Sequence, residues 1–420
     1  MTAPHGIPLP GNRWDLLFGV VPDRPPTVSV VVAHYEQPDQ LARTLAALAA
    51  QDHAPHDLDV IVVDDGSTTP PDVPHGVRLV RQADEGFRLA AARNAGAARA
   101  TGEVLVFLDA DTVPEPAFIR ELVRMPALAP DVVTVGRRRH ADLTGVAPSA
   151  DIRDAASARE LPEPAWLADA YRDSRNLLDA DDRSYRHLIG AVLACSRVMF
   201  DAAGGFDESF TSYGGEDWEW AYRAWLRGAV FAHVPAAVGW HDGPDAAGRT
   251  DAVATAKNAE ALRLADLIPV PGSRPRGIRS AFVDVAVTPP AGASHAQSFV
   301  SVDSVVAAVP GAEAASVADV ESAEGRYDRV RLHLEVLRPL RVSGAGLAAE
   351  IAAMGERGLG ELVVVDPGGV PLLRVVARRA RARAQRWGRD DLFPVRRETV
   401  AGVEAVGGEP DVEAYLGGWG

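Results

Sequence analysis

The sequence predicts an α/β fold in which a mostly parallel, Rossmann-like sheet carries helices on both faces, followed by a smaller α+β domain. Three observations predict it. Strand-like apolar runs alternate with helix-like segments through residue 108, polar clusters follow the strands, and a proline- and glycine-rich stretch at 269–277 precedes the C-terminal region. Alternating strands and helices are typical of parallel sheets, whose strands are joined by helical crossovers.

The alternation begins at residues 27–32, where β-branched residues dominate and turn-forming residues flank the run, as expected of a strand covered on both faces. Residues 39–51 carry leucines at helical spacing, and residues 59–63 form a second apolar strand. The next expected elements are a strand at 77–80, an alanine-rich helix at 89–100 and a strand at 104–108.

The composition indicates a folded, acidic protein. Hydrophobic residues make up 47% and charged residues 24% of the 420 positions, and the formal net charge is −15. This balance allows a sizeable core, and the charge disfavours nucleic acid as a partner. Cys195 is the single cysteine, which excludes an intramolecular disulfide and a cysteine-built zinc site. Because no secretory signal and no apolar run of about 20 residues is visible, we expect a cytoplasmic protein.

Four consecutive parts are expected along the chain. Proline and glycine are frequent before the first strand, and they recur in the stretch that ends the aromatic-rich region. The parts are an N-terminal arm at 1–26, a large domain at 27–268 with halves 27–140 and 141–268, a linker at 269–277, and a C-terminal α+β domain at 278–420.

Polar clusters follow three of the predicted strands, and they read His34-Tyr35-Glu36, Asp64-Asp65-Gly66-Ser67 and Asp109-Ala110-Asp111. Ligands of open parallel sheets bind beyond the carboxyl ends of the strands, so we expect these clusters at one edge. Asp109 and Asp111 offer the oxygen ligands that Mg²⁺ or Mn²⁺ takes together with phosphate oxygens. An isolated pair of this kind is also common in turns and helix caps, but its place beside Asp65 favours a metal site.

Five motifs occur in order between residues 27 and 249, and they are Val60-Ile61-Val62-Val63-Asp64-Asp65-Gly66-Ser67-Thr68, Glu85-Gly86-Phe87-Arg88-Leu89-Ala90-Ala91-Ala92-Arg93-Asn94, Gly102-Glu103 leading to Asp109-Ala110-Asp111, Gly204-Gly205-Phe206-Asp207-Glu208, and Gly214-Gly215-Glu216-Asp217. Together they resemble the inverting family 2 glycosyltransferases, which have the nucleotide-sugar-binding fold named GT-A. The last two motifs are similar to the acceptor half shared by bacterial chondroitin polymerases and animal galactosyltransferases. The resemblance implies a UDP-sugar donor, a divalent cation, and a glycan, lipid-linked or small-molecule acceptor.

The resemblance implies a donor site built from the first three motifs. Asp65 is expected to accept the imide hydrogen of uracil, Asp109 to contact the ribose or a metal-bound water, and Asp111 to ligate the metal that bridges the diphosphate. Arg93 is expected against the base or the phosphates. The structural alternatives are an Asx turn at Asp65 and an Arg93 side chain that reaches solvent. The full set expected at the donor is Tyr35, Glu36, Asp65, Arg88, Arg93, Asp109, Ala110 and Asp111.

The resemblance also implies an acceptor site around the Gly-Gly-Glu-Asp motif. Transfer needs a base that takes the proton of the attacking hydroxyl, and we expect Asp217 in this role. The periodic stretch that follows predicts a helix beginning at Glu216, whose dipole favours ionised carboxylates in its first turn. A purely structural first-turn role is the alternative. Glu216 is expected to hydrogen bond sugar hydroxyls, and Trp218 to contact the acceptor.

His241 lies at the end of another apolar stretch, where the resemblance implies a metal-ligating histidine. A neutral imidazole completes a shell of carboxylate and phosphate ligands, so Asp111 and His241 are the expected protein ligands of Mn²⁺ or Mg²⁺. His233 is the alternative ligand.

Two other classes of protein compete with this interpretation. A nucleotidyltransferase of similar fold usually places a glycine-rich, basic loop after the first strand, where this chain has Ala33-His34-Tyr35-Glu36. A catalytically inactive binding or scaffold protein is expected to lack the base or a metal aspartate, and both are present here. The motifs therefore favour a glycosyltransferase.

The C-terminal region predicts a mixed α+β domain. Its expected strands are 282–287, 330–336, and the two strands of a hairpin at 361–365 and 370–376. Nine arginines lie between Arg374 and Arg397, in a predicted helix. Such a run is typical of a solvated helix face, and the alternative is docking on the anionic inner face of a membrane. Because no paired aspartates recur at a strand end, we expect this domain to be non-catalytic.

Overall fold

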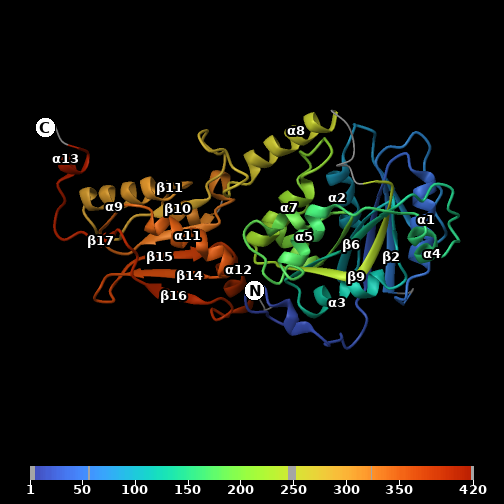
Figure 1. The fold of residues 1–420 in the computed structure, drawn as a ribbon, viewed down its shortest axis with the longest axis horizontal. Coiled ribbons are helices and arrows are strands. Elements are labelled where there is room, and N and C mark those ends of the chain that lie inside the picture. The colour runs from blue at the N-terminus through green and yellow to red at the C-terminus, as the bar shows by residue number, and fades with distance from the viewer. Residues whose placement is uncertain (1–4, 55–56, 245–251, 323, 418–420) are drawn as a thin grey trace.

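The computed structural model describes residues 5–54, 57–244, 252–322 and 324–417. Figure 1 shows an elongated molecule with a sheet towards each end: the N-terminal part of the chain builds the larger sheet, and the C-terminal part builds the smaller one. Among the described helices, none combines the length and the apolar character needed to cross a membrane.

The larger domain contains all elements up to α8. Its strands are β1 (Val28–His34), β2 (Leu58–Asp64), β3 (Arg78–Arg81), β4 (Val104–Asp109), β5 (Thr112–Pro114), β6 (Val132–Ala141), β7 (Glu160–Leu161), β8 (Val192–Ser196) and β9 (Val230–Asp242). Its helices are η1 (Trp14–Leu17), α1 (Pro38–Ala49), α2 (Leu89–Arg99), α3 (Phe118–Leu128), α4 (Ile152–Ser157), α5 (Ala165–Asp173), η3 (Ser184–His187), α6 (Arg197–Ala203), α7 (Glu216–Leu226) and α8 (Ala252–Leu267). The elements expected between residues 27 and 108 are confirmed, with ends that differ by one or two residues.

The larger sheet has nine strands in the order β3-β2-β1-β4-β8-β6-β9-β5, with β7 paired to β6. The strands from β3 to β4 in this order are parallel, as are β6 and β9, whereas β8 is antiparallel to both of its neighbours. The predicted, mostly parallel α/β sheet is therefore confirmed. In the register, His34 stands opposite Asp64 and Ala33 opposite Asp109, so the carboxyl ends of β1, β2 and β4 meet at one edge.

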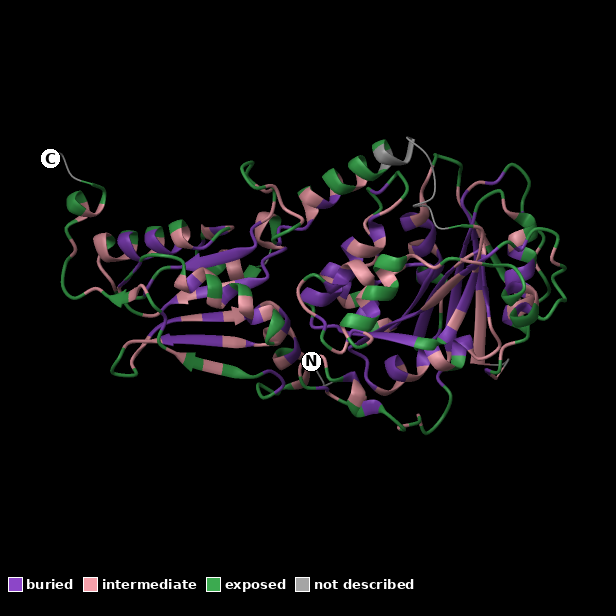
Figure 2. Ribbon diagram, viewed as in Figure 1, coloured by how far each residue is buried: buried purple, intermediate pink, exposed green. Residues whose placement is uncertain are grey.

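Strand β1 lies inside this sheet, and all seven of its residues are buried, as its valine-rich sequence predicts (Figure 2). Helix α2 packs against β1 and β2. Gly96 permits the close approach, because a Cβ atom on it would lie only 2.3 Å from Cγ1 of Val31. The small residues of the alanine-rich helix thus seat it directly on the strands whose ends form the polar edge.

The segments expected as an arm and a linker pack against the core of the larger domain. Leu9, Trp14 and Leu17 belong to the same hydrophobic cluster as β1 and β4, and Val270 belongs to it as well. The side-chain amide of Asn12 also donates to the backbone of β9. The described residues before β1 are therefore an integral part of this domain.

The smaller domain is the expected α+β unit. Its strands are β10 (Val285–Thr288), β11 (Ala312–Ala314), β12 (Leu332–Val336), β13 (Leu340–Val342), β14 (Glu361–Val365), β15 (Pro371–Ala377), β16 (Val395–Glu398) and β17 (Val403–Ala405). Its helices are α9 (His295–Ala308), α10 (Val317–Ser322), η5 (Gly325–Tyr327), α11 (Gly346–Glu356), α12 (Arg378–Trp387) and α13 (Val412–Tyr415). The main sheet has the order β11-β10-β12-β15-β14-β16 and a hydrophobic cluster of its own. The predicted hairpin is present as β14 and β15.

Helix α12 lies at the boundary between the two domains. Arg379 and Arg383 are 7% and 0% exposed, and the Arg379 guanidinium stacks over the ring of Trp225 in α7. Every arginine from Arg374 to Arg396 has a hydrogen-bond or ion-pair partner within the chain. The run is not one helix as predicted, because Arg374 lies in β15 and Arg396 in β16. The side chains of Arg374, Arg389 and Arg396 are 40%, 48% and 42% exposed, so the run is solvated only in part, and the membrane contact stays a prediction.

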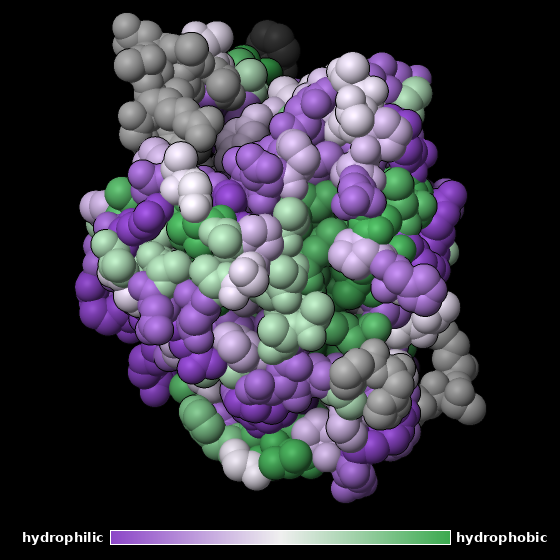
Figure 3. Space-filling model, turned by 90° about the vertical axis from the view of Figure 1, so that its right-hand side faces the viewer, coloured by the Kyte–Doolittle hydropathy of each residue, from purple (hydrophilic) through white to green (hydrophobic). Residues whose placement is uncertain are grey.

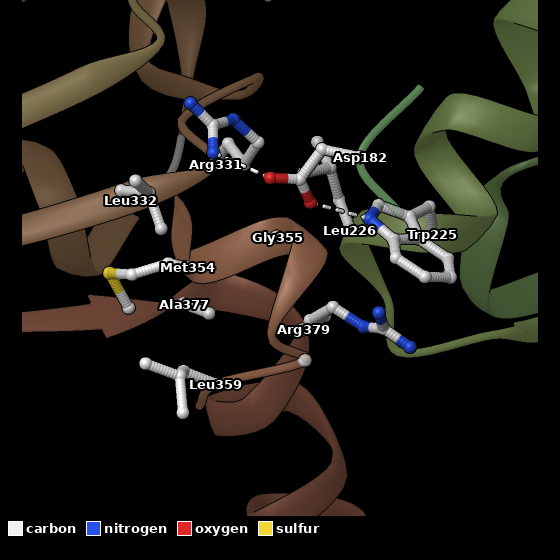
Figure 4. Close-up of a pocket in the computed structure, with 11 residues that line it drawn as sticks. Asp182, Trp225, Leu226, Arg331, Leu332, Met354, Gly355, Leu359, Ala377 and Arg379 are labelled. Carbon is white, nitrogen blue, oxygen red and sulfur yellow. Dashed lines mark hydrogen bonds and ion pairs between the residues drawn. The ribbon is translucent and has the colours of Figure 1, made fainter. Parts of the chain in front are cut away.

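Asp182 joins the two domains, as Figure 4 shows. It accepts a hydrogen bond from Nε1 of Trp225 at 2.9 Å and lies 2.6 Å from Nη1 of Arg331, which also pairs with Asp284 at 2.8 Å. A cavity of about 10 Å³ beside them has room for roughly one water molecule. None of the predicted donor or acceptor residues lines it, so this boundary serves the contact between the domains.

Candidate active site

The carboxyl ends of β1 and β2 form the first wall of the site. Asp64 is fully buried, and its oxygens lie 3.1 Å from Nδ1 of His34 and 2.8 Å from Nε of Arg81. Burial opposes its ionisation, but hydrogen bonds from Ser67, Arg81 and His34 outweigh that effect and hold the pKa of Asp64 below its ordinary value. Asp64 therefore organises the strand ends from inside the domain.

Asp65 is held in place by groups outside its own turn. One oxygen accepts the backbone N–H of Arg88 at 2.9 Å, and the other accepts the side-chain amide of Gln82. The backbone N–H of Ser67 donates to Asp64 and not to Asp65, which disfavours the alternative of an Asx turn at Asp65. A carboxylate has about four acceptor positions, so Asp65 retains capacity for a ligand.

The neighbouring residues expected at the donor differ in their availability. Tyr35 is 47% exposed. Glu36 has a φ of 52° and accepts the backbone N–H of Thr68 at 2.7 Å, a hydrogen bond that lowers the pKa of Glu36. The Arg88 guanidinium pairs with Glu85. Glu36 and Arg88 thus shape the loops around Asp65, whereas Tyr35 and Glu36 are both exposed.

Asp111 and His241 come together because β5 runs antiparallel to β9, which places Thr112 opposite His241. Nδ1 of His241 lies 3.3 Å from Oδ1 of Asp111. Burial raises the pKa of Asp111, but the proximity of His241 outweighs it, so the pKa lies below its ordinary value. His233, the alternative ligand, is instead stacked on Tyr171 with ring centroids 3.7 Å apart.

These two side chains fit a divalent cation. Nδ1 of His241 is buried and has no partner with hydrogen-bond geometry among the described residues, although Oδ1 of Asp111 is close. A carboxylate oxygen and an imidazole nitrogen that converge in this way suit Mn²⁺ or Mg²⁺. Within the described parts of the chain, no three His, Cys, Asp or Glu side chains gather around one point. The other ligands of such a cation would therefore be oxygens of the substrate and of water.

Arg93 connects the donor edge of the sheet to α7. Its guanidinium is buried and lies 2.8 Å from Oδ1 of Asp109 and 2.8 Å from Oε1 of Glu216. The expected contact of Arg93 with the base or phosphates stays a prediction, and the structure adds that two carboxylates hold its guanidinium. Ala110, also expected at the donor, is buried, and its carbonyl accepts the hydroxyl of Thr44 at 2.7 Å.

Helix α7 begins at Glu216, as predicted, after Gly215 turns the backbone with a φ of 91°. Glu216 is buried, and its Oε2 has no hydrogen-bond partner among the described residues. Burial and the charge of Asp217 raise the pKa of Glu216 to about 7, although Arg93 opposes them. Glu216 therefore titrates near neutral pH.

Asp217 is half-buried and carries one hydrogen bond on each oxygen. The backbone N–H of Gly190 donates to Oδ2 at 2.9 Å, and that of Trp218 donates to Oδ1 at 2.8 Å. Burial raises the pKa of Asp217, and the hydrogen bond from Gly190 works against the rise. The two backbone donors fix the orientation of this carboxylate at the start of α7.

Trp218 has an aromatic neighbour that sequence reasoning missed. Its ring lies 6.2 Å from that of Trp166, at 72°, and Trp166 is 47% exposed on α5. Trp220 and Trp225 are buried in the core instead. No motif surrounds Trp166 in the sequence, so nothing in the sequence distinguishes it from the other aromatic residue of α5, Tyr171.

An apolar groove lies elsewhere on the larger domain, on the face that carries α1 and α4. Figure 3 shows hydrophobic side chains gathered in the middle of this face. The groove has a volume of about 350 Å³ and is lined by parts of α1, β5 and the segment 146–152. Arg43 at its wall pairs with Asp242. None of the predicted site residues lines the groove, so it is separate from the polar edge.

Two segments of the chain match known protein families. Residues 29–162 match glycosyl transferase family 2, and residues 180–240 match the N-terminal domain of galactosyltransferase. Validoxylamine A glucosyltransferase of Streptomyces hygroscopicus subsp. limoneus is 34% identical over 48% of this chain and 49% of its own. Chondroitin synthase of Escherichia coli is 28% identical over 58% of this chain and 38% of its own.

Among solved structures, a mannosyltransferase from Pyrobaculum calidifontis in complex with GDP-Man and Mn²⁺ is 21% identical, with a TM-score of 0.40 over 61% of this chain and 67% of that one. This chain spans about half or less of the length of the curated relatives that it matches. The predicted family is nevertheless confirmed by two matches in the expected order. Residues 29–162 are therefore a family 2 glycosyltransferase segment, and residues 180–240 of the same domain are a galactosyltransferase-type segment.

Proposed function

We propose that this chain transfers a sugar from a nucleotide-sugar donor to an acceptor hydroxyl, with inversion at the anomeric carbon and with a divalent cation at the donor. One observation carries the proposal. Arg93 links Asp109 to Glu216, so the donor edge of the sheet lies next to the Asp217 carboxylate at the start of α7. Sugar transfer to a hydroxyl requires this combination of a diphosphate-binding edge and a general base.

The donor is proposed to be a UDP-sugar read by Asp65. Its two oxygens are held by one donor each, from Arg88 and Gln82, and keep further acceptor positions. The imide N–H of uracil is a donor that such a carboxylate recognises, whereas adenine has no ring N–H on its pairing edge. Tyr35, exposed beside Asp65, is the proposed contact for the nucleoside.

Asp111 and His241 are the residues that would hold Mn²⁺ or Mg²⁺. Both side chains are largely buried, and they converge to 3.3 Å. When bound, the cation neutralises charge on the leaving diphosphate. Asp109, whose side chain is 31% exposed, is proposed to contact the ribose or a water at the cation.

Asp217 is the proposed general base. The acceptor oxygen forms a bond to the anomeric carbon from the side opposite the diphosphate, the bond from that carbon to the diphosphate oxygen breaks, and the hydroxyl proton moves to Asp217. Attack from the opposite side inverts the configuration in one displacement. Trp218 and Trp166 offer the acceptor a ring surface next to this base.

Substitution of the base tests the proposal. Asp217→Asn is expected to abolish transfer while sparing donor binding, because the amide cannot take the proton. Asp201→Asn, at an exposed position of α6, is the matched control and is expected to keep wild-type turnover. Full turnover by the Asp217 variant would refute the assignment.

Donor binding tests the cation and the nucleotide. Thermal shifts with UDP-, GDP- and dTDP-sugars in the presence of Mn²⁺ are expected to show selective stabilisation by UDP-sugars, which identifies the donor. Asp111→Ala is expected to remove the metal-dependent part of donor binding. Equal UDP affinity of the wild-type protein with and without Mn²⁺ would contradict the cation site.

We further propose that residues 27–268 carry the reaction, that 269–277 connect the domains, and that 278–420 form a non-catalytic domain that supports α7. The separate hydrophobic cluster of the C-terminal residues and the ion pair of Arg329 with Glu219 in α7 support this division. A cytoplasmic location is proposed as well, since a single buried cysteine suits a reducing compartment.

A further inference from the structure

Strand β6 carries three consecutive arginines, and two of them have carboxylate partners. Nη2 of Arg137 lies 2.6 Å from Oε1 of Glu163, and Nη2 of Arg139 lies 2.5 Å from Oε1 of Glu160. Successive side chains of a strand point to opposite faces of its sheet. Arg138 therefore points away from the face on which its two neighbours are paired.

The face that Arg138 shares is the one that carries the candidate metal pair. In the register of β6 and β9, Arg138 stands opposite Gly239, and His140 stands opposite His241. The rings of His140 and His241 are 5.1 Å apart, which confirms that this row of side chains lies on one face. Arg138 is thus a diagonal neighbour of His241, which contacts Asp111.

Arg138 has no ion-pair partner within contact distance among the residues that the structure describes. Its Nε is buried without a hydrogen-bond partner, and no hydrogen bond or ion pair holds its guanidinium in the described chain. A half-buried cation without a partner is costly, and an arriving anion relieves that cost.

We propose that Arg138 binds the diphosphate of the nucleotide-sugar donor. Its guanidinium would add a second positive charge to that of the divalent cation held by Asp111 and His241. The inference rests on the proposed function and adds a residue to its donor site. A guanidinium presents parallel N–H donors that match phosphate oxygens in a bidentate arrangement. Its position next to the proposed cation ligands is where negative charge grows as the bond between sugar and phosphate breaks.

Nucleotide binding separates this role from others. The affinities of UDP, GDP and uridine are measured by calorimetry for the wild-type protein and for Arg138→Met, with Mn²⁺ and with a chelator. The variant is expected to lose about tenfold to a hundredfold in diphosphate affinity, on the scale of hydrogen bonds to charged groups, and to keep the uridine affinity. The loss of diphosphate affinity is expected to be larger with the chelator than with Mn²⁺, because without the metal ion the diphosphate depends more on the charge of Arg138.

Arg137→Met is the matched control, since it removes the adjacent charge from the opposite face, and it is expected to keep wild-type affinities. Arg138→Lys keeps the charge without the bidentate geometry, and we expect an intermediate affinity. Because the Arg138 side chain has no hydrogen bond to lose and its unpartnered charge is costly, Arg138→Met is expected to unfold at or above the wild-type temperature.

An unchanged diphosphate affinity in folded Arg138→Met would overturn the inference, as would equal losses of affinity for diphosphate and for uridine. A defect confined to the KM of the acceptor would also overturn it and would assign Arg138 to the acceptor side. In each of these cases the wild-type protein still binds the donor, and the proposed function stands. A wild-type protein that binds no nucleoside diphosphate would overturn both.

Discussion

Arg329→Met is expected to destabilise the protein and to weaken transfer, because this residue of the smaller domain contacts the helix that carries Asp217. Nη1 of Arg329 lies 2.5 Å from Oε1 of Glu219, and the other oxygen of Glu219 pairs with Arg223 at 2.7 Å. Glu219 is fully buried in the first turn of α7. The hydroxyl of Tyr222, also on α7, donates to the carbonyl of Arg329 at 3.1 Å.

The magnitude follows from burial. Removing one partner of a buried ion pair costs about 3–5 kcal/mol, and the lower end of that range applies because Arg223 still pairs with Glu219. At about 2–4 °C per kcal/mol for a domain of this size, the unfolding temperature falls by about 6–12 °C. Thermal unfolding followed by circular dichroism measures the change. We also expect a lower kcat at unchanged UDP affinity, since α7 holds the base and not the nucleoside.

Arg326→Met is the matched control in the same domain. Arg326 pairs with Glu313 at 2.7 Å near the surface, where such a pair contributes about 0–1 kcal/mol. Equal unfolding temperatures for the two variants would refute the reasoning. Truncation after Pro269 is a poorer test, because it would leave Asp182 without the Arg331 partner and uncover the Trp225 ring.

At the candidate site, Arg93→Met is expected to lower the free energy of unfolding by about 3–5 kcal/mol. Arg93→Lys is expected to restore little of it, since one ammonium does not span two carboxylates. Urea unfolding measures both variants, and wild-type free energies would contradict the role of Arg93 in joining Asp109 to Glu216. Because burial raises the pKa of Glu216 from 4.5 to about 7, the folded state holds this proton more tightly, so the free energy of unfolding falls as pH rises between those values, by up to ~1.4 kcal/mol per pH unit. Glu216→Gln is expected to flatten that slope, and parallel stability curves would contradict the shift. Trp166→Ala is expected to raise the KM of the acceptor severalfold at unchanged donor affinity in steady-state kinetics; a change in donor affinity alone would exclude the proposed acceptor contact.

Local patterns predicted the larger domain well because its elements depend on neighbours in the sequence. The valine run of β1, the alanines of α2 and the glycines before Glu216 each determine the local backbone or its burial. The convergence of Asp65 with Asp109 at one edge also followed from the strand order. These inferences needed only strand and helix periodicity and the rule that parallel strands end together.

Pairings between distant segments could not be predicted in this way. Arg93 lies on an alanine-rich helix, and nothing nearby in the sequence shows that it forms an ion pair with Glu216. The arginines of α12 look like a solvated run until Trp225 and other residues of the larger domain are placed against them. Arg138 is hidden for a related reason: three consecutive arginines look alike in a sequence, and only the pairing of two of them distinguishes the third.

The two adjacent carboxylates of α7 have different surroundings, and this difference supports Asp217 over Glu216 as the base. A general base must be ionised and oriented before the hydroxyl arrives, and the N–H groups of Gly190 and Trp218 favour both conditions. Glu216 is deeper, and its pKa of about 7 leaves a large share of it protonated at neutral pH. A protonated Glu216 donates a hydrogen bond through its unpartnered Oε2, which suits a sugar hydroxyl better than it suits proton removal. Arg93 then has a second role. Its charge keeps the pKa of Glu216 from rising further, and its guanidinium holds Glu216 beside Asp109 at the donor edge.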